Sequence, residues 1–89
     1  MKIYIVGGTT GAYSDRTDWV VCAYTDSEQA ETHVRNAMLR AKEIEKSRES
    51  RYTAVRGINE FDPEMRMDYT GTEYYTVETE LVTETKIQS

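Results

Sequence analysis

The sequence predicts a small α+β domain in which one long helix packs on a small antiparallel sheet of three to four strands. Two β-branched and aromatic runs, residues 3–6 and 19–24, indicate the first two strands. Between residues 30 and 44, apolar side chains recur at three- and four-residue spacing, which is typical of a helix with one apolar face. Residues 75–81 alternate apolar and polar side chains, so the expected order is β-β-α-β, with room for one more strand in the last third.

The length and composition agree with this fold class. A chain of 89 residues is long enough for one domain only, so we expect residues 1–89 to form a single domain with a frayed end at 85–89. The net charge is −5, and no apolar run is long enough to span a membrane. One Cys cannot form an internal disulfide or a Cys-rich zinc site, so we expect a cytoplasmic protein without a metal or other cofactor.

The first strand is expected to end at the pair Gly7-Gly8, and residues 7–18 to form a long hairpin loop. The second strand, residues 19–24, carries apolar side chains on both sides. This pattern predicts a central strand that is covered on both faces.

The helix has a clear start and an open end. Asp26 or Ser27 is suited to cap its first turn. The apolar stripe breaks after Ile44, yet Tyr52 and Val55 could resume it and carry the helix to residue 56. A helix of that length would overhang a compact domain of this size, which would favour a homodimer.

The last third is expected to begin with a turn or a new capping site at Asp62-Pro63, because the residue before proline avoids the helical region. A short strand over residues 65–70 and a turn at Gly71 would follow. In the closing strand, the odd-numbered residues from Tyr75 to Leu81 are expected on the buried side, and the acidic residues between them on the solvent side.

The acidic residues gather in this last third. Residues 59–89 contain eight Asp or Glu against two Lys or Arg, a net charge of −6, whereas residues 28–51 carry six Lys or Arg against five Glu. Binding to phosphates needs a basic surface, so nucleic acid is not expected as a direct partner. An acidic face could instead occupy the basic groove of a protein that binds nucleic acid; the alternative is a solvated face that keeps the protein soluble. The residues predicted to face the partner are Asp62, Glu64, Asp68, Glu78, Glu80 and Glu84.

A second candidate site is a loop that places an aromatic ring, a hydroxyl, an acid and a base side by side. A small ligand or nucleotide could stack on the ring and pair with the base, and the alternative is a solvated turn. The nearby glycines at 7, 8 and 11 lack the spacing of a P-loop or a dinucleotide-binding loop. The candidate loop residues are Tyr13, Ser14, Asp15 and Arg16.

Catalysis is the least favoured class of function. Cys22 and His33 are the only thiol and the only imidazole of the chain. Cys22 lies in the middle of a strand and is expected to be a small core residue, while His33 lies on the flank of the helical stripe and is expected to be partly exposed. No nucleophile–base pair is therefore expected, and no catalytic residue is assigned.

Four segments carry a resemblance to a known group of proteins. They are the opening strand Ile3-Tyr4-Ile5-Val6, the loop Gly11-Ala12-Tyr13-Ser14-Asp15, the following Thr25-Asp26-Ser27-Glu28-Gln29-Ala30 and the closing Tyr75-Thr76-Val77-Glu78-Thr79-Glu80-Leu81. In these segments the chain resembles small, mostly uncharacterised bacteriophage and prophage proteins. The resemblance implies a phage origin and a β-β-α-β layout, and it brings no catalytic residue. The chain departs from the group in its long helix and around Asp62-Pro63.

Origin, size and charge together favour a non-enzymatic phage accessory protein that binds another protein, of the host or the phage, in the cytoplasm of an infected bacterium. The sharper hypothesis is an inhibitor of a host defence nuclease, whose basic surface would meet the acidic face. Two alternatives stay open, namely a small-ligand or nucleotide binder that uses residues 7–16 and a structural dimer built on the helix.

Overall fold

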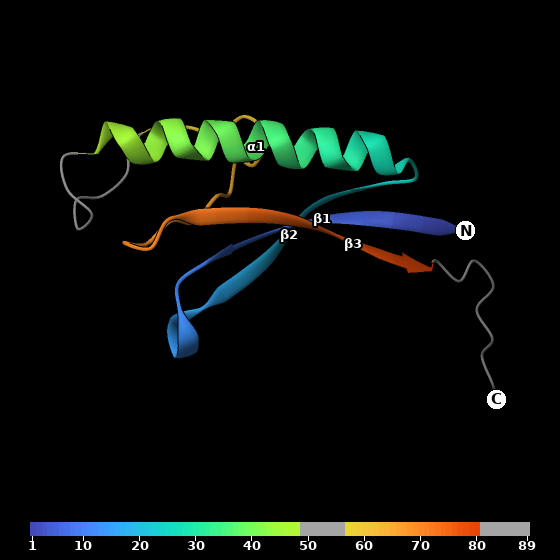
Figure 1. Ribbon diagram of the computed structural model, residues 1–89, viewed down its shortest axis with the longest axis horizontal. Helices are drawn as coiled ribbons and strands as arrows, with labels where there is room; N and C mark the ends of the chain where they lie inside the picture. Colours follow the sequence, from blue (N-terminus) through green and yellow to red (C-terminus); the bar gives the residue numbers. More distant parts are fainter. Residues whose placement is uncertain (49–56, 81–89) are drawn as a thin grey trace.

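The protein is an α+β fold of one antiparallel sheet and one helix, seen in a computed structural model that describes residues 1–48 and 57–80 (Figure 1). The elements in chain order are β1 (Lys2–Thr10), the 3₁₀ turn η1 (Tyr13–Asp15), β2 (Thr17–Tyr24), α1 (Ser27–Ser47) and β3 (Thr72–Glu80). The strands are arranged β2-β1-β3, and β1 is antiparallel to both neighbours. The predicted fold class and the order β-β-α-β are thereby confirmed.

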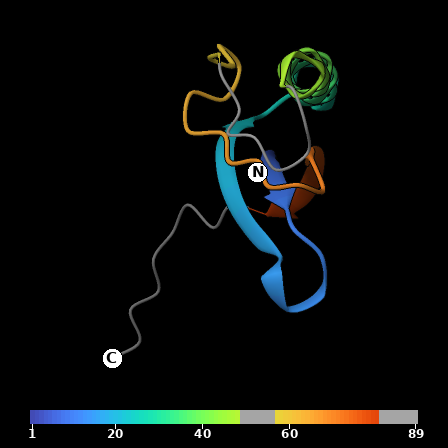
Figure 2. The same cartoon turned by 90° about the vertical axis from the view of Figure 1, so that its left-hand side faces the viewer.

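Helix α1 lies along one face of the sheet (Figures 1 and 2). Asp26 caps it as predicted, because its carboxylate accepts the Glu28 backbone N–H at 2.9 Å. The side of α1 that faces the sheet is built largely of small residues, including the fully buried Ala30 and Ala37. Their size lets the helix approach the sheet closely, and Tyr74 of β3 packs against this side.

The helix ends at Ser47, where the Arg48 backbone turns to an extended conformation. The predicted continuation through Tyr52 and Val55 falls outside the described residues. Within the described ranges, no helix has the length and apolarity needed to cross a lipid bilayer.

Strand β1 was predicted to end at Gly7-Gly8, but it continues to Thr10. A Cβ atom on Gly7 would lie 2.6 Å from the ring of Tyr75, and one on Gly8 would lie 2.7 Å from the ring of Trp19. The two glycines therefore give up their side-chain space to neighbouring aromatic rings, and the loop between the strands shortens to residues 11–16.

Strand β2 is an edge strand, so its prediction as a central strand covered on both faces is wrong. Strand β1 occupies the centre of the sheet, and α1 covers only one face. Trp19 lies on the covered face, where Asp62 accepts its indole N–H. Val20, the next residue, points to the opposite face and is largely exposed. The apolar residues on both sides of β2 thus meet two different environments.

The segment before β3 also differs from prediction. Residues 65–70 form no strand, and only a bridge between Asp68 and Gly71 pairs there. The turn at Asp62-Pro63 is confirmed, because the Met65 N–H donates to the Asp62 carbonyl at 3.0 Å. In β3 the buried side carries Tyr74 rather than Tyr75, since register with β1 places the even-numbered residues under α1.

Candidate functional site

Asp62 is an internal residue, so its prediction as part of an acidic surface is wrong. Its side chain is buried, with a residue exposure of 2 %. One carboxylate oxygen accepts the indole N–H of Trp19 at 2.9 Å and the hydroxyl of Tyr74 at 2.7 Å. Burial, and then the bond to Asp62, raise the pKa of Tyr74 well above its usual range. Asp62 therefore joins β2, β3 and the turn before β3.

Asp68 is half-buried and is also held by hydrogen bonds from its neighbours. Its carboxylate accepts the Thr70 hydroxyl, the Thr70 N–H at 2.7 Å and the Thr10 hydroxyl at 3.2 Å. The Thr70 hydroxyl makes the largest contribution to a lowered pKa of Asp68. This acid ties the turn at residues 68–71 to the end of β1.

The remaining acidic residues of the predicted face differ in their ion pairing. Glu64 is exposed on the turn that follows Asp62. Glu78 and Glu80 lie on the same side of β3, as predicted, and both are exposed. Glu78 pairs with Lys2 at 3.2 Å, Glu80 pairs with the N-terminal amine of Met1 at 3.0 Å, and Glu84 lies outside the described residues.

The four residues of the candidate loop stay together at the tip of the β1–β2 hairpin, and all are exposed. Tyr13 is 97 % exposed and has a φ of 56°, in the left-handed region that a bulky residue rarely adopts. Ser14 and Asp15 complete the 3₁₀ turn, while Arg16 pairs with Asp18 at 3.0 Å. The base that could hold a charged ligand is thus already engaged.

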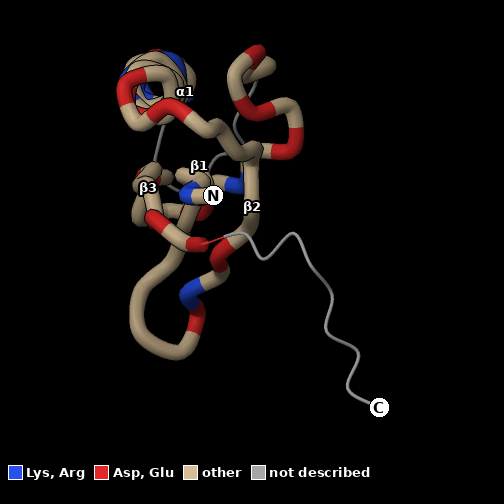
Figure 3. Tube along the Cα trace, turned by 90° about the vertical axis from the view of Figure 1, so that its right-hand side faces the viewer, with Lys and Arg blue, Asp and Glu red and all other residues tan. Residues whose placement is uncertain are grey.

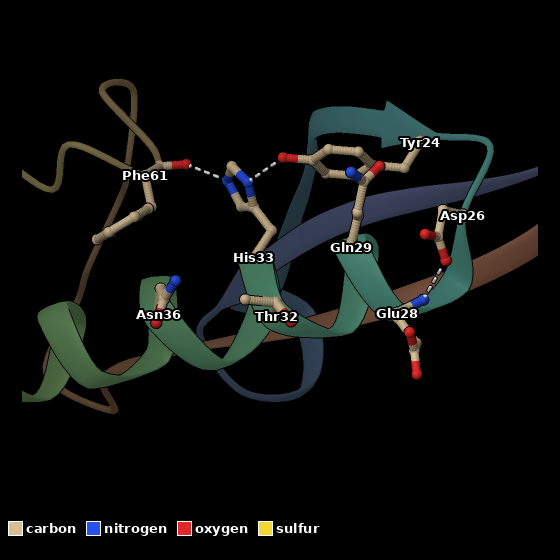
Figure 4. Close-up of a pocket in the computed structure, with 8 residues that line it drawn as sticks. All are labelled: Tyr24, Asp26, Glu28, Gln29, Thr32, His33, Asn36 and Phe61. Atoms are coloured by element: carbon tan, nitrogen blue, oxygen red, sulfur yellow. Dashed lines mark hydrogen bonds between the residues drawn. The ribbon is translucent and has the colours of Figure 1, made fainter.

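A groove opens beside the first half of α1, on the side of β2 (Figure 4). It has a volume of about 590 Å³ and is lined by residues from the end of β2, from α1 and from the turn at Phe61. His33 stands at its back, with Nδ1 2.8 Å from the Tyr24 hydroxyl and Nε2 2.6 Å from the Phe61 carbonyl oxygen. The half-buried state of His33 confirms its prediction as a partly exposed helix residue.

Cys22 and His33 both interact with Tyr24, a proximity that the sequence did not reveal. Cys22 is only half-buried, so its prediction as a core residue is not met. Burial nevertheless raises the pKa of the thiol, against the opposing effect of the Tyr24 hydroxyl. A thiol with a raised pKa holds less thiolate at neutral pH, so this arrangement does not activate a nucleophile.

A second cleft, of about 410 Å³, opens on the other side of the α1 start, towards β1 and β3. Glu31 and Glu78 line it, as Asp26 and Glu28 line the groove, and neither cavity is lined by Lys or Arg. We call these four carboxylates the acidic end. Figure 3 views the molecule from this end, with acidic segments at the start of α1 and at the end of β3.

Three of the four carboxylates make no ion pair within the part of the chain that the structure describes. Within the described residues, Asp26, Glu28 and Glu31 make no ion pair, while Glu78 pairs with Lys2. Arg35, one turn after Glu31, donates to the Thr32 hydroxyl at 3.2 Å instead. The sequence offered a signal for this cluster in the acids of the first helical turns, but that signal is equally explained by the helix dipole.

The sequence matches no protein family, and no curated protein or solved structure is significantly similar to it.

Proposed function

We propose that this chain is a non-enzymatic binding protein whose acidic end occupies a basic surface of another protein. The observation that carries the proposal is the pair of cavities beside the α1 start, which are lined by four carboxylates and by no Lys or Arg. Unpaired carboxylates on an exposed rim attract a basic partner and raise its rate of association. The net charge of −5 acts in the same direction.

The proposed partner class is a protein that binds nucleic acid, such as a defence nuclease of a bacterium infected by the phage from which the chain would come. Such a protein presents Lys and Arg side chains spaced to meet phosphates. The contact surface differs from the one read from the sequence, since Asp62 is buried and Asp68 is engaged in hydrogen bonds within the protein. It combines Asp26, Glu28 and Glu31 with Glu78 from the original set.

The test uses the tagged full-length chain to capture its partner from a bacterial lysate treated with nuclease. We expect one protein in stoichiometric amount, which a duplex DNA oligonucleotide then displaces because both ligands use the same basic surface. Capture that is indifferent to DNA and to salt would contradict the proposal, as would capture of nothing.

Two triple variants locate the contact. The acidic-end triple is E28Q, E31Q and E78Q. The control triple is E43Q, E64Q and E73Q, which makes the same change of net charge elsewhere on the surface. Each triple removes one exposed ion pair, from Glu78 to Lys2 or from Glu43 to Arg40. Asp26 is kept in both because it caps α1.

A further inference from the structure

In the groove beside α1, the hydrogen bonds of His33 indicate which groups donate and which accept. The Phe61 carbonyl oxygen can only accept, so His33 Nε2 carries the proton and donates to it. In the neutral imidazole, His33 Nδ1 is then an acceptor, and the Tyr24 hydroxyl donates to it. The only proton of the Tyr24 hydroxyl is then used within the protein, and the same hydroxyl also interacts with Cys22.

Two side-chain amides project from α1 into the same groove. Gln29 and Asn36 stand seven residues apart, about two helical turns, on one face of the helix (Figure 4). Neither amide has a hydrogen-bond partner within the described residues. Their carbonyl oxygens can therefore accept hydrogen bonds from a ligand.

The negative charge of the groove favours a positively charged ligand. Asp26 and Glu28 line its outer end, and no cationic side chain lines it. An anionic ligand would be repelled here. A cation with several N–H groups would meet carboxylate and amide oxygens.

The aromatic side chains narrow the choice further. The ring of His33 lies 5.7 Å from that of Tyr24 and 5.9 Å from that of Phe61, measured between centroids. Tyr and Phe rings attract cations to their faces, and a planar guanidinium can stack on a ring while its edge still donates hydrogen bonds. An ammonium group is more strongly hydrated and cannot do both.

We propose that this groove receives the guanidinium group of an arginine side chain, which donates to the amide oxygen of Gln29 or to that of Asn36. The inference rests on the proposed function, since the arginine would belong to the basic partner. It goes beyond that function because it names one residue type of the partner and the groove that binds it.

A small probe tests the seat without the partner. N-acetyl-arginine amide is titrated into the ¹⁵N-labelled chain at constant pH and ionic strength, and amide chemical shifts are followed. We expect saturable shifts at Tyr24, Gln29, His33 and Asn36, with a dissociation constant on the order of 1–10 mM because one side chain makes few contacts. N-acetyl-citrulline amide, the neutral isostere, should give none. Equal shifts with citrulline or with N-acetyl-lysine amide would overturn the inference.

Variants connect the probe to the residues. Gln29→Ala with Asn36→Ala should weaken probe binding at least five-fold, whereas Leu39→Ala with Lys42→Ala, on α1 outside the groove, should leave it unchanged. Equal weakening by both pairs would contradict the assignment.

The two proposals fail separately. If the partner is captured in a DNA-sensitive manner but the arginine probe does not bind, the inference fails and the proposed function stands. If the probe binds in the groove but capture of the partner does not depend on the acidic end, the arginine seat stands and the proposed function fails.

Discussion

Asp62 and Asp68, in the segment before β3, accept hydrogen bonds from within the protein, whereas Glu28 and Glu31, in the first turns of α1, accept none from the described residues. The four carboxylates are alike in type and differ in surroundings. A carboxylate that is already hydrogen-bonded to indole and hydroxyl groups contributes to stability. One that faces only water remains available to a partner.

Among the variants that test this comparison, Asp62→Ala is expected to lose the most stability. The substitution leaves the half-buried indole N–H of Trp19 and the buried hydroxyl of Tyr74 without their acceptor. We expect a loss of about 3 kcal/mol in the free energy of unfolding, measured by urea denaturation. For a domain of this size, that lowers the midpoint of thermal unfolding by about 15 °C.

The exposed neighbour Glu64 provides the control for Asp62. Glu64→Ala should change the free energy of unfolding by less than about 0.5 kcal/mol. Similar losses for the two variants would mean that the burial of Asp62 does not set its role.

The next effect comes from Gly8→Ala, which disturbs the same hydrogen bond through packing. The added Cβ would lie 2.7 Å from the Trp19 ring and must displace it. We expect a loss of about 2 kcal/mol. Trp19 is the only Trp of the chain, so its fluorescence should also shift to the red as the ring moves towards water. An unchanged emission spectrum with full stability would contradict this packing.

A third, smaller effect is a pH dependence carried by Asp68. Hydrogen bonds in the folded state, that of the Thr70 hydroxyl first, lower its pKa from 3.8. The unfolded chain therefore binds the proton more readily, and the stabilisation is present above about pH 4 and is lost as the pH falls through the folded pKa. Urea denaturation between pH 5 and pH 2 should show a smaller decline for Asp68→Asn than for the unsubstituted chain. Parallel declines would contradict the role of Asp68.

The smallest effect on stability is expected for the acidic-end triple. Within the described residues, Glu28 and Glu31 make no ion pair and Glu78 makes one exposed pair with Lys2, so the three substitutions should cost less than about 1 kcal/mol in total. Thermal unfolding measures this directly. A larger loss would show that these carboxylates serve the fold, as Asp62 does.

The parts of the fold that depend on near neighbours in the chain were predictable. The Asp26 cap lies two residues from the N–H that it binds, and the buried alanines of α1 follow the helical period. Gly7 and Gly8 led to the wrong prediction that the strand ends there. The rings of Tyr75 and Trp19, which occupy the space beside these glycines, come from other strands.

Long-range pairing decided what the pattern left ambiguous. Tyr74 and Tyr75 are adjacent, and alternation alone cannot tell which of them faces the core; register with β1 selects Tyr74. Asp62 reads in the sequence as one more acid of an acidic segment. Its donors, Trp19 and Tyr74, are 43 and 12 residues away, so no local pattern could mark it as buried.

The acidic end was missed for a related reason. Counting charges along the chain favoured residues 59–89, yet folding buries Asp62, engages Asp68 in hydrogen bonds and brings Glu78 beside the start of α1. A net charge over a segment says nothing about how many of its carboxylates remain unpaired at the surface.

The most direct test of the account is the affinity of the captured partner for the two triple variants, measured by titration calorimetry at two salt concentrations. We predict that the acidic-end triple weakens binding at least about ten-fold, close to 1.4 kcal/mol, and reduces the dependence on salt. The control triple should stay within two-fold of the unsubstituted chain. Equal losses in both triples, or a loss in the control triple alone, would contradict the placement of the binding surface at the start of α1.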